Sequence, residues 1–254
     1  LLPVSALVGD NIVERSERTP WYSGPSLLGL LETLEPEDLV ADKPFRFPVQ
    51  LTIRPQGAAS DGLSEYRGYA GRVASGRVGV GDEVVALPSG RTTTVAGIDT
   101  ADGELAEAFA PLSVTLRLTE ELDLARGELL ASGDAPSPTQ DLNGTVAWLG
   151  RQPLRAGARV LVKHGTRTVK GLVRGVHGRL DLDTLAPVAA DALELNDIGR
   201  VEVRLASAIA PDPYEASRTT GSFLLIDPQT GENLAAGMVR AAVHVDDDPL
   251  DWVI

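Results

Sequence analysis

Cysteine is absent from this chain of 254 residues. Its absence excludes disulfides, thiolate nucleophiles, iron–sulfur clusters and cysteine-ligated zinc, and it fits a reducing compartment. Long apolar runs are missing as well, since no stretch approaches the roughly 20 residues that a membrane-spanning helix needs. The N-terminus also lacks the charged-then-apolar layout of a signal peptide. We therefore expect a cytoplasmic protein.

Positive charge is scarce. The chain has 23 Lys and Arg against 36 Asp and Glu, which gives a formal net charge of −13 and a sequence pI ≈ 4.7. A balance this acidic argues against proteins that bind nucleic acid or anionic lipid, because their phosphates would be repelled. The net charge of the whole chain gives no support for a local basic patch. The 43% hydrophobic and 23% charged content is that of an ordinary globular protein.

Methionine occurs once, at Met238, so Leu1 is not an initiator residue. We therefore expect the chain to be part of a longer protein.

Glycine and proline are plentiful, with 26 and 17 residues, and they separate short β-branched runs. This pattern is typical of an all-β protein. A first group of strands is predicted at 45–53, 69–73, 83–87, 92–98 and 113–118, with a hairpin turn at Pro88–Gly90. A second group is predicted at 145–149, 159–164, 168–173, 199–205, 223–226 and 234–240. Ser132–Pro138 between them has the composition of an interdomain connector.

The predicted fold is mainly β, with two consecutive small antiparallel barrels after a strand–helix remnant of an α/β domain. The remnant comprises a short strand at Leu2–Leu7 and a helix that begins after Gly24-Pro25-Ser26 and ends at Pro36. We place the domains at 1–41 (remnant), 42–133 (first barrel), 134–241 (second barrel) and 242–254 (acidic tail).

Motifs for chemistry are weak. Gly71–Arg77 has the glycine spacing of a phosphate loop but lacks the Lys-Ser/Thr pair and lies among strands, so bends in a barrel are the better interpretation. Three isolated histidines, His164, His177 and His244, have no partner at metal-ligand spacing. Asp181 and Asp183 could ligate a cation, although such pairs are usually solvated. The residues alone predict no catalytic site and no metal site.

Arg67–Val84 resembles the second domain of elongation factor Tu-like GTPases, in which a glycine pattern bends a barrel strand and hairpin. A narrower set of segments comprises Pro3–Val13, Trp21–Leu28, Leu31–Leu34, Arg46–Gln50 and Arg54–Pro55. Later segments that agree are Leu87–Arg91, Asp123–Gly127, Lys163–Arg167, Gly221–Asp227 and Ala235–Val239. Together these segments resemble the subunit 1 family of bacterial sulfate adenylyltransferases, the GTPase subunit of a heterodimer.

The resemblance implies that Ser5, Ala6 and Leu7 are the last guanine-binding motif of a GTP-binding domain, in which the Ala6 amide would contact the guanine carbonyl oxygen. It also implies that the phosphate loop, the magnesium-binding switches and the Asn-Lys-x-Asp motif lie upstream of Leu1. We expect GTP and Mg²⁺ for the intact subunit, and neither GTP binding nor hydrolysis for this chain alone.

For the intact complex, the resemblance implies a sulfate adenylyltransferase in which GTP hydrolysis drives formation of adenosine 5′-phosphosulfate from ATP and sulfate. The barrels would relay a conformational change and dock the catalytic subunit, subunit 2. The alternative is a fragment of a translation elongation factor-like GTPase that binds tRNA or the ribosome. A third alternative is a structural remnant with no affinity for a partner.

Overall fold

The computed structural model describes residues 1–34, 40–55 and 66–241, which form two compact units, 1–39 and 40–254. The predicted acidic tail, 242–254, and His244 lie outside the described residues. In the described part of the chain, no helix has the length and apolar character needed to cross a membrane. The two units are described separately.

The first unit contains a single helix, α1 (Leu27–Thr33), among its described residues. The side chain of Ser26 caps α1 by accepting a hydrogen bond from the Gly29 amide, as expected for a serine at this position. The predicted strand at Leu2–Leu7 is wrong, because this segment forms only one isolated bridge, between Ser5 and Asp10. A strand needs a neighbour along its length, and the described residues of this unit supply none.

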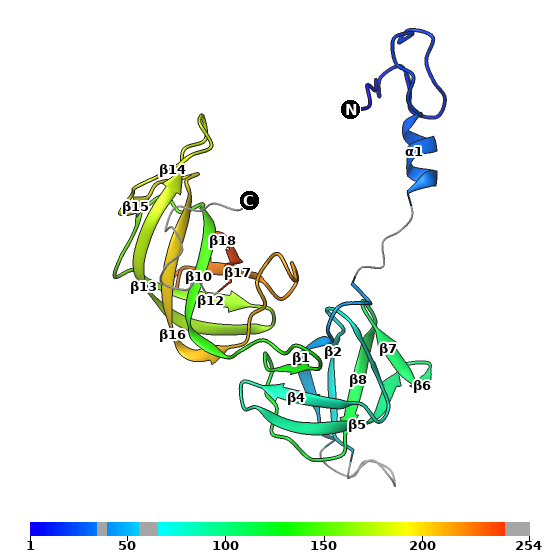
Figure 1. The fold of residues 1–254 in the computed structure, drawn as a ribbon. Coiled ribbons are helices and arrows are strands. Elements are labelled where there is room, and N and C mark those ends of the chain that lie inside the picture. The colour runs from blue at the N-terminus through cyan, green and yellow to red at the C-terminus, as the bar shows by residue number, and fades with distance from the viewer. Residues whose placement is uncertain (35–39, 56–65, 242–254) are drawn as a thin grey trace. The chain divides into compact units, whose positions relative to one another are not determined.

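The second unit begins with a closed ring of six antiparallel strands, in the order β4-β9-β1-β2-β8-β5 and back to β4 (Figure 1). Its strands are β1 (Arg46–Ile53), β2 (Gly68–Arg72), β4 (Glu83–Leu87), β5 (Arg91–Thr100), β8 (Ser113–Leu118) and β9 (Leu129–Ala131). Three short strands, β3 (Arg77–Gly79), β6 (Gly103–Leu105) and β7 (Glu107–Phe109), complete this barrel. Closure leaves the ring no free edge.

A second ring of six antiparallel strands follows, in the order β12-β17-β18-β10-β16-β13 and back to β12. Its strands are β10 (Thr139–Trp148), β12 (Arg159–His164), β13 (Arg167–Leu180), β16 (Ile198–Ile209), β17 (Ser222–Ile226) and β18 (Asn233–Val239). β14 (Pro187–Val188) extends it beside β13, and β11 (Leu154–Arg155) pairs with β15 (Ala192–Leu193). The mainly β fold with two antiparallel barrels is therefore confirmed.

Each barrel has a core of its own, built by alternation of inward apolar and outward polar residues. Phe45, Phe47, Ile98, Leu116 and Leu130 are among the buried residues of the first core. Leu142, Val162, Leu205, Phe223 and Leu225 are among those of the second. Strand pairing in the two closed barrels fixes which side chains lie side by side on their outer faces. These faces carry the residues described below.

Candidate functional site

The predicted guanine-contacting residues lie in a tight turn of the first unit. The Ser5 amide donates to the Asp10 carbonyl at 3.1 Å, and the Gly9 amide donates to the Ser5 carbonyl at 2.9 Å. Ala6 and Leu7 sit at the exposed tip of this turn. A backbone N–H at an exposed tip is available to a ligand oxygen, so the geometry allows the contact predicted for Ala6. The guanine-binding role of the three residues remains a prediction.

Asn11 organises this turn, although the sequence pattern did not single it out. Its side chain is fully buried, and Nδ2 donates to the Pro3 carbonyl at 2.8 Å and to Thr19 Oγ1 at 2.9 Å. Its Oδ1 accepts from the Ser16 amide at 2.8 Å. Asn11 has φ 54°, a left-handed conformation that asparagine tolerates better than most residues. That tolerance is the one signal by which Asn11 could have been found.

Asp10, which precedes Asn11 in the chain, stabilises the loop that follows the turn. Its Oδ1 accepts from Ser16 Oγ at 2.5 Å and pairs with Arg18 Nη2 at 2.8 Å. The hydrogen bond from Ser16, together with the Arg18 guanidinium, lowers the pKa of the Asp10 carboxyl. Asp10 and Asn11 thus hold the tip residues in place through the segment that leads to α1.

The junction of the two barrels contains a buried ion pair that sequence reasoning missed. Arg46 on β1 and Asp212, between β16 and β17, have side chains only 4% and 9% exposed. Arg46 Nη2 lies 2.9 Å from Asp212 Oδ1, and Nε lies 3.0 Å from Oδ2, a bidentate arrangement. The two residues are 166 positions apart, so spacing along the chain gave no signal.

The other hydrogen bonds of Arg46 go to backbone carbonyls of Phe45, directly before β1, and of the connector, residues 132–138. Nη1 donates to the carbonyls of Phe45 at 3.0 Å and Ser132 at 3.2 Å, and Nη2 also donates to that of Asp134. Arg46 therefore ties the first barrel, the connector and the second barrel together.

The network continues into the second barrel from Asp212. Thr220 Oγ1 donates to Asp212 Oδ2 at 2.6 Å, and the Thr220 carbonyl lies 2.6 Å from His164 Nε2. Because a carbonyl only accepts, Nε2 of His164 carries the proton. Burial has the largest influence on the pKa of His164, and it lowers that pKa.

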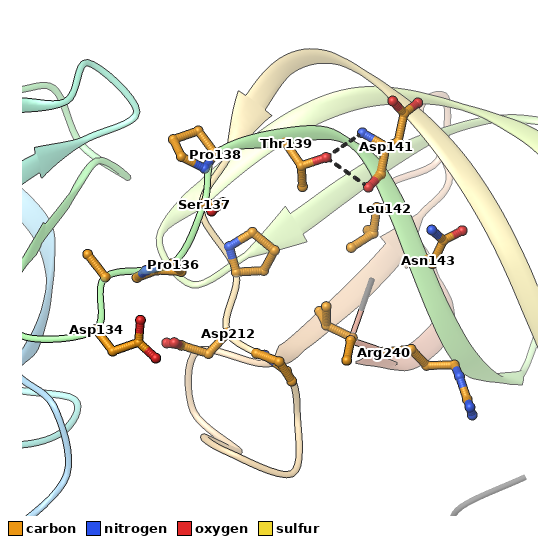
Figure 2. Close-up of a pocket in the computed structure, with 15 residues that line it drawn as sticks. Asp134, Pro136, Ser137, Pro138, Thr139, Asp141, Leu142, Asn143, Asp212 and Arg240 are labelled. Atoms are coloured by element: carbon orange, nitrogen blue, oxygen red, sulfur yellow. Dashed lines mark hydrogen bonds between the residues drawn. The ribbon is translucent and has the colours of Figure 1, made fainter. Parts of the chain in front are cut away.

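A cavity of about 510 Å³ opens beside this junction (Figure 2). It lies between the connector, the start of β10 and Pro211–Pro213. Thr139 Oγ1 closes a small loop there with the amide and carbonyl of Asp141, both at 3.0 Å. The carboxylate of Asp212 is already bound by Arg46, so it is not free to act on a molecule in this cavity.

The other sequence candidates serve the fold. Gly71 lies in β2, and Gly76 forms the bend before β3, so Gly71–Arg77 is a strand–bend–strand segment and not a phosphate loop.

The histidines and the aspartate pair also have structural surroundings. His164 belongs to the buried network, whereas exposed His177 lies 3.5 Å from Glu202. Asp181 Oδ1 accepts from the amides of Asp183 and Thr184, so it caps a turn. Among the described residues, no group of three His, Asp or Glu side chains could hold a metal ion.

A family model described as "GTP-eEF1A C-terminal domain-like" matches residues 141–240, which cover nearly all of the second barrel.

Curated relatives match nearly the whole chain. The "Bifunctional enzyme CysN/CysC" of Mycobacterium tuberculosis is 44% identical over 94% of this chain and 39% of its own length. "Sulfate adenylyltransferase subunit 1" of Teredinibacter turnerae is 43% identical over 95% of this chain and 50% of its own length. The protein of that name from Photobacterium profundum is 41% identical over 96% of this chain and 50% of its length. The chain thus spans half or less of the length of these relatives.

Among solved structures, a crystal structure of Sup35 complexed with GMPPNP superposes with a TM-score of 0.71 and 22% sequence identity. The match covers 95% of this chain and 58% of the Sup35 chain. At this identity the likeness shows the shared fold alone.

Proposed function

We propose that this chain belongs to the sulfate adenylyltransferase subunit 1 family and is the two-barrel part of a GTPase subunit that couples GTP hydrolysis to sulfate activation. The observation that carries this proposal is identity of 41–44% to such proteins over 94–96% of the chain. The Sup35-like fold supports the barrels but does not select the reaction.

The proposed reaction joins ATP and sulfate into adenosine 5′-phosphosulfate and pyrophosphate on a separate catalytic subunit, subunit 2. This equilibrium lies far toward ATP and sulfate, so a second, favourable hydrolysis has to drive it. A coupling subunit needs an element that carries movement from one site to another. The junction of Arg46 and Asp212 suits this task, because it makes the second barrel follow the first.

The first unit has a smaller proposed role. The tip at Ala6 would donate its amide to the guanine carbonyl oxygen, with Asp10 and Asn11 fixing the turn. The residues present do not fit the triphosphate or Mg²⁺, since the described part of the chain has no carboxylate cluster and its glycine bend lies within a barrel. We therefore propose that GTP and Mg²⁺ bind only when the rest of the subunit is present. We propose a cytoplasmic location for the complex, because the proposed reaction consumes ATP and GTP.

Gel filtration tests the docking role directly. The chain is mixed with subunit 2 from the same organism, and we expect co-elution at micromolar concentrations. Titration of the chain with a fluorescent GTP analogue should show no saturable binding. Separate elution from subunit 2 by a chain whose barrels are intact in circular dichroism would contradict the proposal. Tight, salt-sensitive binding of tRNA would favour a translation factor instead.

A further inference from the structure

Four cations lie on the second barrel of this acidic protein, and the described residues give none of them a carboxylate partner. They are Arg159 and Lys163 on β12 and Lys170 and Arg174 on β13, here called the basic strip, and all four are exposed. Most other arginines pair with Asp or Glu, but within residues 1–34, 40–55 and 66–241 no carboxylate lies within 4.0 Å of the strip's charged groups.

The register of β12 and β13 places three of these cations on one outer face. Arg159 lies opposite Leu172, and Lys170 lies opposite Leu161. Lys163 follows two residues after Leu161 on the same face, while Val160, Val162 and Val169 point into the core. Lys170 is the diagonal neighbour of both Arg159 and Lys163, and diagonal neighbours lie about 7–8 Å apart, so the charges are close enough to act on one partner surface.

An apolar row continues from the basic strip around the barrel. Lys163 lies opposite Leu224, Leu224 opposite Ala236, Ala236 opposite Ala147 and Ala147 opposite Ile198. With Met238, these apolar residues line a depression of about 460 Å³, here called the apolar hollow, whose lining also includes Lys163, Tyr214, Thr219 and Ser222. The hollow exists because two alanines stand in the middle of the row, where larger side chains flank them.

We propose that the basic strip and the apolar hollow form a docking surface for a protein partner that inserts an apolar side chain into the hollow and sets carboxylates against the strip. An apolar centre beside a charged rim is the usual anatomy of a protein–protein interface. Charge complementarity selects an acidic partner surface, because like charges would be repelled. This inference rests on the proposed function, and it assigns the surface to subunit 2.

A nucleic acid fits the same surface less well. Single strands bind where exposed aromatic side chains offer stacking platforms, and the basic strip consists of Arg and Lys with the leucines Leu161 and Leu172 between them. The aromatic residues that line the hollow are buried Phe223 and half-buried Tyr214, which offer little ring surface for stacking. A net charge of −13 opposes the approach of a long polyanion, whereas a short acidic patch on a folded protein meets only the local cations.

Binding measurements with charge-reversed chains test the assignment. The dissociation constant for subunit 2 is measured at low and high salt by calorimetry, with the full 254-residue chain. The double variant Lys163→Glu/Lys170→Glu should weaken binding by about tenfold or more and flatten its salt dependence. The control Arg72→Glu/Arg151→Glu makes the same change of charge at exposed sites outside the surface, and should stay within about twofold of the parent. Circular dichroism verifies the fold of each variant.

A third variant tests the hollow apart from the charges. Ala236→Trp fills the depression from an exposed position, so we expect weakening of about tenfold with an unchanged salt dependence. Binding of all variants with the parent's dissociation constant would overturn the docking surface and leave the proposed function standing. Failure of the parent chain to bind subunit 2 would overturn both. Binding of tRNA that Lys163→Glu/Lys170→Glu abolishes would replace the acidic protein with a nucleic acid.

Discussion

The guanidinium of Arg46 on the first barrel meets the carboxylate of Asp212 on the second through two hydrogen bonds, at 2.9 Å and 3.0 Å, with both side chains almost fully buried. A buried pair of this kind gains little over apolar residues of the same volume, but breaking it is costly. The pair instead contributes to the orientation of the barrels, because a bidentate arrangement fixes how the two barrels face one another.

Removing one partner should therefore destabilise the protein strongly. We expect Arg46→Met to lower the free energy of unfolding by about 3–5 kcal/mol, because the Asp212 carboxylate stays buried without its cation. Urea denaturation measures this change. Arg54→Met, which removes an exposed pair with Glu121, should cost about 0–1 kcal/mol.

The double variant Arg46→Met/Asp212→Leu separates charge burial from simple loss of contact. It should recover most of the stability that Arg46→Met loses, because no unpaired charge remains. Equal losses in the single and double variants would show that the pair's charges do not matter.

His164 makes stability depend on pH near neutrality. Its pKa is lowered in the folded state, whereas the unfolded chain titrates at the ordinary value of 6.5, so the unfolded state binds the proton more readily. The contribution of His164 is full above about pH 6.5 and is lost as the pH falls toward the lowered pKa. The loss of unfolding free energy between pH 7.5 and 5.5 should be larger for the parent than for His164→Gln, as measured by urea denaturation at both values.

Asp10, Asp181 and Asp227 also have lowered pKa values, but their ordinary value is 3.8, so their contributions are lost only at more acidic pH. These three aspartates therefore do not change the free energy of unfolding between pH 7.5 and 5.5, where His164 does. An identical pH dependence in the parent and in His164→Gln would contradict the assignment.

Asn11 should control the order of the predicted guanine-contacting turn. Asn11→Gly keeps access to the left-handed backbone but removes three side-chain hydrogen bonds, to Pro3, Thr19 and Ser16. We expect faster amide hydrogen exchange across residues 3–19 and unchanged protection in the barrels, read by mass spectrometry. Protection of residues 3–19 equal to the parent's would show that the turn is held by other contacts.

The strands with clear alternation were predictable from sequence, because a half-buried strand reveals its inward face. Glu83–Leu87, Ser113–Leu118 and Arg159–His164 match the predicted limits. β13 was predicted at 168–173 but reaches Leu180, because register shifts after Val173 and Val176 interrupt the alternation. Short strands such as β9 and β11 carry too few residues to show a period.

The functional features divide in the same way. Ser5–Leu7 was singled out through the family resemblance, and its guanine-binding role stays a prediction. Its support by Asn11 depends on contacts with both Pro3 and Thr19, which no local pattern indicates. The ion pair of Arg46 and Asp212 joins residues far apart in the chain, so only the folded arrangement reveals it. The outer row from Lys163 to Ile198 depends on the register of five strands, which local periodicity does not specify.

Gly76 should not accept a side chain at the bend after β2. Its φ is +72°, and a Cβ there would lie 2.5 Å from the Lys43 carbonyl oxygen and 2.5 Å from the Phe45 nitrogen. Both are backbone atoms, so the chain that leads into β1 would have to shift. Gly90, in the turn between β4 and β5, has a similar φ of +75° but no atom within 4 Å of such a Cβ. A side chain at either position would strain the backbone, but only at Gly76 would it also collide with other atoms.

Alanine at each position isolates that difference. Gly90→Ala should cost about 1–2 kcal/mol of unfolding free energy from left-handed strain alone. Gly76→Ala should cost clearly more, because the collision with Lys43 and Phe45 displaces the segment that leads into Arg46. Urea denaturation of both variants gives the comparison. Equal losses would mean that the chain before β1 moves aside freely, and then Arg46 could not hold the second barrel in a fixed direction.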